Sequence, residues 1–201
     1  MMTVELFLSP TVPATVDAEL AERLLRTLTT EDGAPEQVLG KARELTHVVV
    51  HRPAAWATGD PGDRPRYLAR VTAPGAWVNS PEFGAHIVSA LTRTIAGTEP
   101  DPARLTREPH CVVQIVGLRE HALGVLGAPV TSGEIVRMMT REFRDSGVTV
   151  EAPEGYAVDP VCGMTVEIAS ARIRLAHDGV EHYFCAPGCR KVFAEDLAPA
   201  D

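Results

Sequence analysis

A strand, an amphipathic helix and a second strand follow one another twice in this chain, and this repeat restricts the fold more than any other feature of the sequence. The first unit has an apolar strand at residues 4–9, a helix with apolar residues at four-residue steps, and the apolar run THVVVH at residues 46–51. The helix face is made by Val16, Leu20, Leu24 and Leu28. Such a β-α-β unit places two parallel strands under one helix.

The second unit repeats this order with strands at residues 66–71 (RYLARV) and 111–118 (CVVQIVGL). The helix between them carries Phe83, Ile87, Leu91 and Ile95 on one face. Ser80 followed by Pro81 is typical of a helix start, because serine caps free amide groups and proline is preset for the first helical position. The sequence therefore predicts an α+β fold, in which tandem β-α-β units form a four-stranded sheet with both helices on one face.

The other face of this sheet has no predicted cover, since no further long helix is indicated before Thr131. A sheet that leaves an apolar face bare must bury it against another layer, and a second copy of the chain can supply that layer. We therefore expect a homo-oligomer.

Charge and hydropathy argue against two kinds of partner. The formal net charge of −8 disfavours nucleic acid, because binding to phosphates depends on Lys and Arg. No apolar run approaches the roughly 20 residues needed to cross a bilayer. The N-terminal residues MMTVELFLSP also lack the basic flank and long apolar stretch of a signal peptide. We expect neither nucleic acid nor membrane as a partner, and a cytoplasmic location.

A third helix is predicted at residues 133–143, because Thr131 and Glu134 have the spacing of a capping box. Its apolar face carries Ile135, Met138, Met139 and Phe143. An extended linker at residues 145–155 then separates a first domain, residues 1–144, from a second domain, residues 156–201.

The tandem units resemble the tautomerase superfamily, of the oxalocrotonate-tautomerase and macrophage-migration-inhibitory-factor type. The resemblance spans roughly residues 3–139 and rests also on the phrases THVVVHRPAAWATG and TAPGAWVNSPEFGAHIVSALTRTI and on the Gly-rich turn at residues 124–127. It implies a trimer, whose contacts would cover the bare sheet face, and a small-molecule ligand at the subunit interface. The family's chemistry uses an N-terminal proline as general base. Here Met2 and Thr3 follow Met1, so we assign no catalytic residue.

Other groups of this part could act on a carbonyl or carboxylate compound, but their spacing reveals no set of nucleophile, base and orienting group. They are Arg66, Arg70, His47, His51, His110 and His121. Cys111 opens an apolar strand, where we expect it to serve as a small core hydrophobe.

The other three cysteines, Cys162, Cys185 and Cys189, lie in the last part of the chain. So short a segment cannot bury enough apolar surface alone, since domains below about 40 residues usually need a disulfide, a metal or an oligomer. A reducing cytosol favours metal ligation over a disulfide. Asp178 and Gly179 predict a type I′ hairpin that pairs ARIRLAH with VEHYFC and sets Arg174 opposite Tyr183. APG then opens a helix with Cys189 in its first turn, where the helix dipole favours a thiolate.

The turn DPVCGM, the phrase HYFC and a further cysteine four positions on resemble the YHS domain, a small treble-clef-like metal module related to the TRASH family. The resemblance implies that Cys162, Cys185 and Cys189 are metal ligands. It also implies a module found with heavy-metal transporters, sensors and some oxygenases. The fourth ligand stays open between His182, water, a substrate and none. A closed four-ligand site would hold zinc, whereas three thiolates alone suit copper(I).

Two functions follow from these features. The first is a metal-binding protein that captures or senses a thiophilic heavy-metal ion through a YHS domain on a trimeric, tautomerase-like scaffold. The alternative is an isomerase or tautomerase-like enzyme that acts on a small carbonyl or carboxylate compound and contains a structural zinc. An adaptor for a metal ATPase or an oxygenase is a third function that the sequence permits.

Overall fold

The computed structural model describes residues 1–30, 33–60 and 62–198. The chain forms two compact units. The first contains Met1–Thr29 and Leu45–Leu118, and the second contains Thr30–Glu44 and Arg119–Asp201. The division of the chain into functional domains at residues 144 and 156 stays a prediction.

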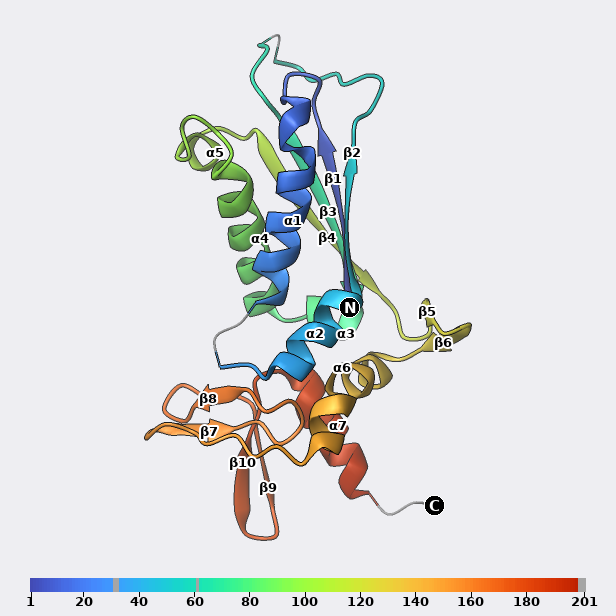
Figure 1. Ribbon diagram of the computed structural model, residues 1–201, viewed down its shortest axis with the longest axis vertical. Helices are drawn as coiled ribbons and strands as arrows, with labels where there is room; N and C mark the ends of the chain where they lie inside the picture. Colours follow the sequence, from blue (N-terminus) through green and yellow to red (C-terminus); the bar gives the residue numbers. More distant parts are fainter. Residues whose placement is uncertain (31–32, 61, 199–201) are drawn as a thin grey trace. The chain divides into compact units, whose positions relative to one another are not determined.

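The first unit is built on the predicted four-stranded sheet, and this prediction is confirmed (Figure 1). Its strands are β1 (Met2–Leu8), β2 (Thr46–His51), β3 (Tyr67–Pro74) and β4 (Cys111–Leu118). Their order is β2-β1-β3-β4. The pairs β1 with β2 and β3 with β4 are parallel, as expected within a β-α-β unit, and the central pair β1 with β3 is antiparallel. The two β-α-β repeats therefore meet along their first strands, β1 and β3.

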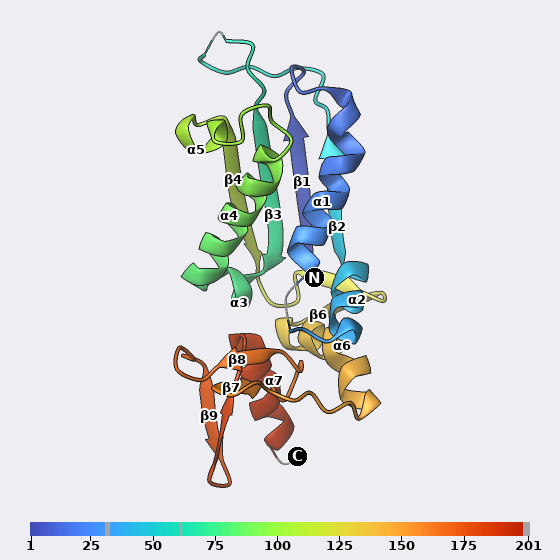
Figure 2. The same cartoon turned by 60° about the vertical axis from the view of Figure 1, so that its left-hand side comes forward.

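Helices α1 (Asp17–Thr29) and α4 (Pro81–Ala96) cover one face of this sheet, as predicted (Figures 1 and 2). Ser80 caps α4, its hydroxyl oxygen accepting a hydrogen bond from the Phe83 amide at 3.3 Å. The core between helices and sheet is fully buried and is made by Val4, Leu6, Leu8, Leu20, Leu24, Val71, Leu91 and Ile95. Burying each such side chain stabilises the fold by roughly 1.5–3 kcal/mol, so this layer anchors the unit. Short helices η1 (Ala14–Val16), α3 (Gly75–Val78) and α5 (Arg104–Arg107) complete the unit.

The opposite sheet face is open within this unit. The exposed fraction is 42% for Val49, 48% for Val112 and 41% for Val116. These residues alternate along β2 and β4 with side chains that pack against the core, such as Val48 and Val113. Among the described residues of the first unit, no helix covers this face, as the sequence predicted.

The described residues of the second unit form three helices and three short two-stranded sheets (Figure 1). Its helices are α2 (Glu36–Glu44), α6 (Ser132–Ser146) and α7 (Pro187–Leu197), and its strands are β5 (Leu123–Val125), β6 (Ala128–Val130), β7 (Tyr156–Val158), β8 (Thr165–Glu167), β9 (Arg174–His177) and β10 (Val180–Tyr183). Helix α6 packs against both α2 and α7. In the described residues no helix is long and apolar enough to span a bilayer.

Helix α6 begins with the predicted capping box. The Thr131 hydroxyl oxygen accepts from the Glu134 amide at 3.2 Å, and the Thr131 amide donates to the Glu134 carboxylate at 2.6 Å. The helix runs on through Asp145 and Ser146, beyond the predicted end, and Gly147 with φ of 65° closes it in the left-handed conformation. Glycine adopts this conformation without strain, which explains why the helix ends there.

The β9–β10 hairpin has the predicted turn and register. Asp178 and Gly179 have φ of 48° and 77°, and both values are positive as a type I′ turn requires. Tyr183 lies opposite Arg174, and the Phe184 amide extends the pairing by donating to the Ile173 carbonyl at 2.9 Å. The hairpin therefore ends next to Cys185.

Candidate metal centre

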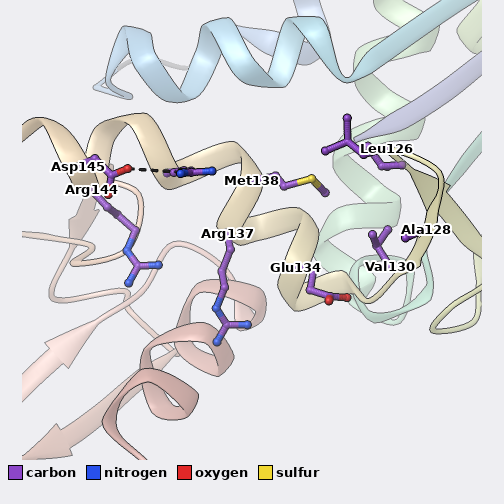
Figure 3. A pocket seen from close by; sticks show the side chains of 10 residues that line it. Leu126, Ala128, Val130, Glu134, Arg137, Met138, Arg144 and Asp145 are labelled. Atoms are coloured by element: carbon purple, nitrogen blue, oxygen red, sulfur yellow. Dashed lines mark ion pairs between the residues drawn. The ribbon is translucent and has the colours of Figure 1, made fainter. Parts of the chain in front are cut away.

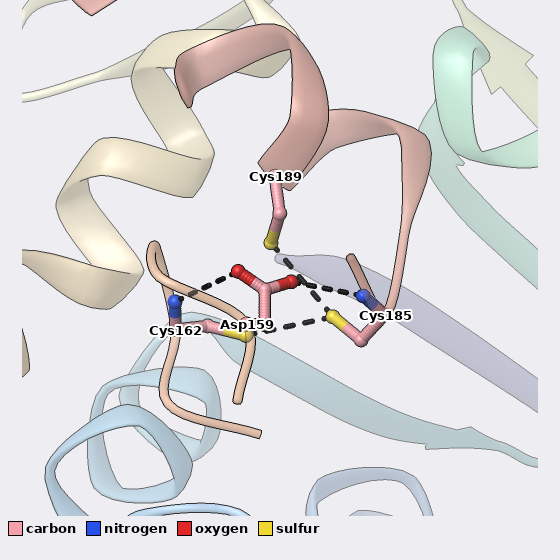
Figure 4. Close-up of side chains that lie close together, drawn as sticks. All are labelled: Asp159, Cys162, Cys185 and Cys189. Atoms are coloured by element: carbon pink, nitrogen blue, oxygen red, sulfur yellow. Dashed lines mark hydrogen bonds between the residues drawn. The ribbon is translucent and has the colours of Figure 1, made fainter. Parts of the chain in front are cut away.

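Three sulfur atoms converge in the second unit. The Sγ of Cys185 lies 3.5 Å from that of Cys162 and 3.8 Å from that of Cys189 (Figure 4). Together with a carboxylate oxygen of Asp159, the ligand atoms all lie within 4.8 Å of one another. The three cysteines that the sequence singled out are thus brought together, from a turn, from the residues after a strand and from the first turn of α7.

The turn that carries Cys162 is fixed by its own backbone. The Asp159 amide donates to the Met164 carbonyl at 2.8 Å, and the Gly163 amide donates to the Asp159 carbonyl at 2.8 Å. Gly163 has φ of +74°, and a Cβ atom there would lie 2.4 Å from Cζ of Phe143 on α6. Only glycine fits both the backbone conformation and the space.

Asp159 joins this turn to Cys185. Its Oδ1 accepts from the amides of Val161 at 2.8 Å and Cys162 at 3.3 Å. Its Oδ2 accepts from the Cys185 amide at 2.9 Å, and Figure 4 shows the bonds to Cys162 and Cys185. The residue is 0% exposed. Sequence reasoning missed Asp159, although it is the first residue of the turn DPVCGM and aspartate commonly accepts from amides two or three positions on.

Apolar side chains surround the sulfur atoms. Val161, Phe184 and Val192 are buried, and the rings of Phe184 and Phe193 lie 5.4 Å apart. His182, one candidate for the fourth ligand, packs against Phe193 with the ring centroids 4.7 Å apart and lies outside the cluster of four. This apolar shell limits the access of water and strengthens electrostatic interactions inside it.

The electrostatics of the cluster favour one thiolate shared among three sulfur atoms. Hydrogen bonds from the thiols of Cys185 and Cys189 lower the pKa of Cys162 to about 4. The same hydrogen bond to Cys162 raises the pKa of Cys185. Burial, followed by the Cys162 thiolate, raises the pKa of Asp159 to about 6. Three thiolates therefore need a cation to coexist here, and a bound cation would displace the remaining protons.

The dimensions and chemistry of the cluster fit a thiophilic metal. Four ligands at a Zn–S distance of about 2.3 Å in tetrahedral arrangement lie about 3.8 Å apart. The two sulfur separations of 3.5 and 3.8 Å are close to this value. Cys162, Cys185 and Cys189 could supply soft ligands, and Asp159 one oxygen.

The groups considered for catalysis form two pairs, His51 with Arg70 around Glu5 and His110 with Arg66 around Asp60, while His47 and His121 belong to neither. In the first unit, His51 stacks on Phe7 at 4.6 Å and lies 3.4 Å from the Glu5 carboxylate, which also has Arg70 at 3.9 Å. Elsewhere in that unit, Nδ1 of His110 lies 2.7 Å from Nη1 of Arg104, whose Nε and Nη2 donate to the two oxygens of the Glu99 carboxylate. Asp60 pairs with Arg66 and lies 3.6 Å from Nε2 of His110. His121 lies in the second unit, and His47 is exposed on β2.

Cys111 behaves as expected for a partly buried core residue. It packs against the hydrophobic core of the first unit, and burial raises the pKa of its thiol to about 11.

The second unit also contains an open hollow of about 700 Å³ beside α6 (Figure 3). Its apolar walls come from Val125, Leu126, Val130 and Met138, and its rim carries Arg141, which pairs with Asp145 at 3.5 Å. None of the four residues of the sulfur cluster lines it.

Comparison with known proteins finds solved structures that resemble part of the chain and no family. No protein-family profile matches the chain, and no curated protein matches it. Solved structures with a similar fold include Pt0534 inactivated by 2-oxo-3-pentynoate, with 17% identity, a TM-score of 0.49 and coverage of 64% of this chain and 95% of that one. A fused 4-OT wild-type symmetric trimer has 13% identity, a TM-score of 0.47 and coverage of 64% and 94%. A macrophage migration inhibitory factor homologue from Prochlorococcus marinus has 14% identity, a TM-score of 0.47 and coverage of 64% and 98%.

Proposed function

We propose that this chain captures or senses a thiophilic heavy-metal ion through a YHS-type module in which Cys162, Cys185 and Cys189 are the ligands. The observation that carries the proposal is the convergence of the three sulfur atoms, with separations of 3.5 and 3.8 Å. The three cysteines lie in different parts of the fold: a turn, the segment after a strand and the first turn of a helix. Closeness along the sequence therefore does not explain why their sulfur atoms converge.

The electrostatics support ligation over a purely structural role. Cysteines that only fill a core are commonly neutral and face apolar neighbours. Here hydrogen bonds from neighbouring thiols stabilise a thiolate at Cys162, and a thiolate is the form that binds metal. The metal is zinc or copper(I), the ions that thiolate ligands select.

The first unit would act as a tautomerase-like scaffold that assembles into a trimer and presents three such modules. Support comes from the open sheet face, where Val49, Val112 and Val116 are exposed. Contacts between copies of the chain would bury this face, and a small-molecule ligand would fit at the subunit interface.

Elemental analysis tests the metal proposal directly. The full chain is refolded under reducing conditions with Zn²⁺ or Cu(I), passed through gel filtration and analysed for metal. We expect one ion per chain, and its loss in the triple variant C162S/C185S/C189S. Cys111→Ser is the matched control and should keep the ion. Wild-type protein free of metal after gel filtration would contradict the proposal.

A tautomerase-like enzyme with a structural zinc is a second candidate. The observation that favours it is the group on the open sheet face, where Glu5 lies near both His51 and Arg70 and where the guanidinium could hold a carboxylate. The test follows tautomerisation of enolisable keto acids. A rate that does not change in variants of Arg66, Arg70 and the histidines would eliminate this function.

A further inference from the structure

Asp159 is close enough to the sulfur atoms to be taken for the fourth ligand. We infer instead that Asp159 is a positioning residue, and that the site binds a soft monovalent cation, copper(I), on three sulfur atoms in preference to zinc. The inference rests on the proposed metal-binding function and specifies its ligand set and its metal.

The carboxylate of Asp159 already has three donors. A carboxylate oxygen has two lone pairs, and Oδ1 uses both for the amides of Val161 at 2.8 Å and Cys162 at 3.3 Å. A metal–oxygen bond of about 2.0–2.2 Å at Oδ1 would displace one of these amides. Oδ1 is therefore not available as a ligand.

The other oxygen, Oδ2, connects the turn to Cys185, which lies far away in the sequence. Oδ2 accepts from the Cys185 amide at 2.9 Å, across a separation of 26 residues. Because Oδ1 holds the Cys162 amide, one carboxylate fixes the backbone at two of the three cysteines. Oδ2 keeps a second lone pair, but a metal bound there would withdraw electron density from the oxygen that accepts from the Cys185 amide. Binding would therefore weaken the hydrogen bond that holds Cys185 beside Cys162, where their sulfur atoms lie 3.5 Å apart.

Asp159 is buried within a turn whose backbone is fixed. Asp159 is 0% exposed, and its backbone amide and carbonyl are both hydrogen-bonded within the turn, to Met164 and Gly163. Gly163 of this turn also packs against Phe143. The carboxylate is therefore held in the orientation that receives the amides.

Three thiolates without an oxygen ligand are a soft donor set, which suits copper(I). Zinc is almost always four-coordinate in structural sites and would have to recruit a further ligand such as water. Carboxylate oxygen, by contrast, suits harder ions. The role assigned to Asp159 thus decides the preference of the site between the two metals.

X-ray absorption of the full chain loaded anaerobically with Cu(I) tests the ligand set. We expect sulfur neighbours only, three per copper ion. An oxygen neighbour of copper in the wild type would overturn this inference and leave the metal-binding function intact, and its loss in Asp159→Asn would identify Asp159 as its source. Protein that retains no copper would overturn both. The wild-type spectrum decides the question even if the variant does not fold.

A competition experiment separates positioning from ligation. Asparagine keeps one acceptor oxygen but cannot accept from two sides, so Asp159→Asn should weaken both Cu(I) and Zn²⁺ binding by a similar factor, roughly 10- to 100-fold. Glu181→Gln removes an exposed carboxylate of the same module and should change neither affinity. A loss for Zn²⁺ much larger than that for Cu(I) in Asp159→Asn would identify Asp159 as a zinc ligand and overturn the inference.

Discussion

A Cβ atom at Gly163 would lie 2.4 Å from Cζ of Phe143, so the turn that carries Cys162 and the helix α6 touch where no side chain fits. This contact couples the geometry of the sulfur cluster to the packing of α6. The turn keeps its shape only while that space remains free for the aromatic ring.

Gly163→Ala should destabilise the second unit and weaken metal binding. The left-handed backbone alone costs a non-glycine residue about 1–2 kcal/mol, and the clash with Phe143 adds to this cost. Urea denaturation and metal titration measure the two effects. Gly155→Ala is the matched control, since Gly155 has φ of +82° with nothing within 4 Å of its Cβ position. Equal losses in both variants would show that the contact with Phe143 is unimportant.

Leu91→Ala should lower the free energy of unfolding by about 2–5 kcal/mol, because it leaves a cavity between α4 and the sheet. Leu91 is 0% exposed at the centre of the core of the first unit. Val88 lies on the same helix but is 42% exposed, so Val88→Ala should change the stability by less than about 0.5 kcal/mol. Chemical denaturation of the two variants checks the prediction, and similar values would mean that α4 packs differently.

Val112→Glu should dissociate the proposed trimer. Val112 is 48% exposed on the open face of the sheet, and a charge buried there between copies of the chain would have no partner. Light scattering after gel filtration should then give a mass near the 21.6 kDa of one chain. Val88→Glu places the same charge on the helix side and should leave the assembly unchanged. An unaltered mass for Val112→Glu would exclude this face as the interface.

Cys111 should react slowly with iodoacetamide in the folded protein. Burial raises the pKa of its thiol to about 11. At pH 8 only about one thiol in a thousand would be ionised, against roughly a quarter for an unperturbed cysteine with a pKa of about 8.5. Mass spectrometry of peptides from folded and urea-unfolded protein measures the difference. Equal rates in the two states would show that the thiol is accessible and that its strand is loosely packed.

Local chemistry explains why so much of the fold could be predicted from the sequence. The cap at Ser80, the capping box of Thr131 with Glu134 and the turn at Asp178 and Gly179 each depend on residues at most three positions apart. The apolar residues recur every two positions in the strands and every four in the helices, and this period sets which face of α1, α4 and each strand is buried. All these signals lie within a few residues of one another in the sequence.

Helix α2 was not predicted, because its nine residues, EQVLGKARE, bury only Val38 and are too short for an apolar period to stand out. It is held by packing against α6, a contact between distant parts of the chain. The helix α6 likewise continues through Asp145, where the sequence suggested a linker, until Gly147 ends it.

The sequence by itself determined the tandem β-α-β units, the open sheet face and the cysteines that converge, because each depends on residue type and local spacing. The tertiary structure alone decided how far apart the sulfur atoms lie, the fit of Gly163 against Phe143 and the place of Asp159. The hydrogen bond from Cys185 to Asp159 joins residues that only the fold brings together, and no pattern along the chain encodes its geometry.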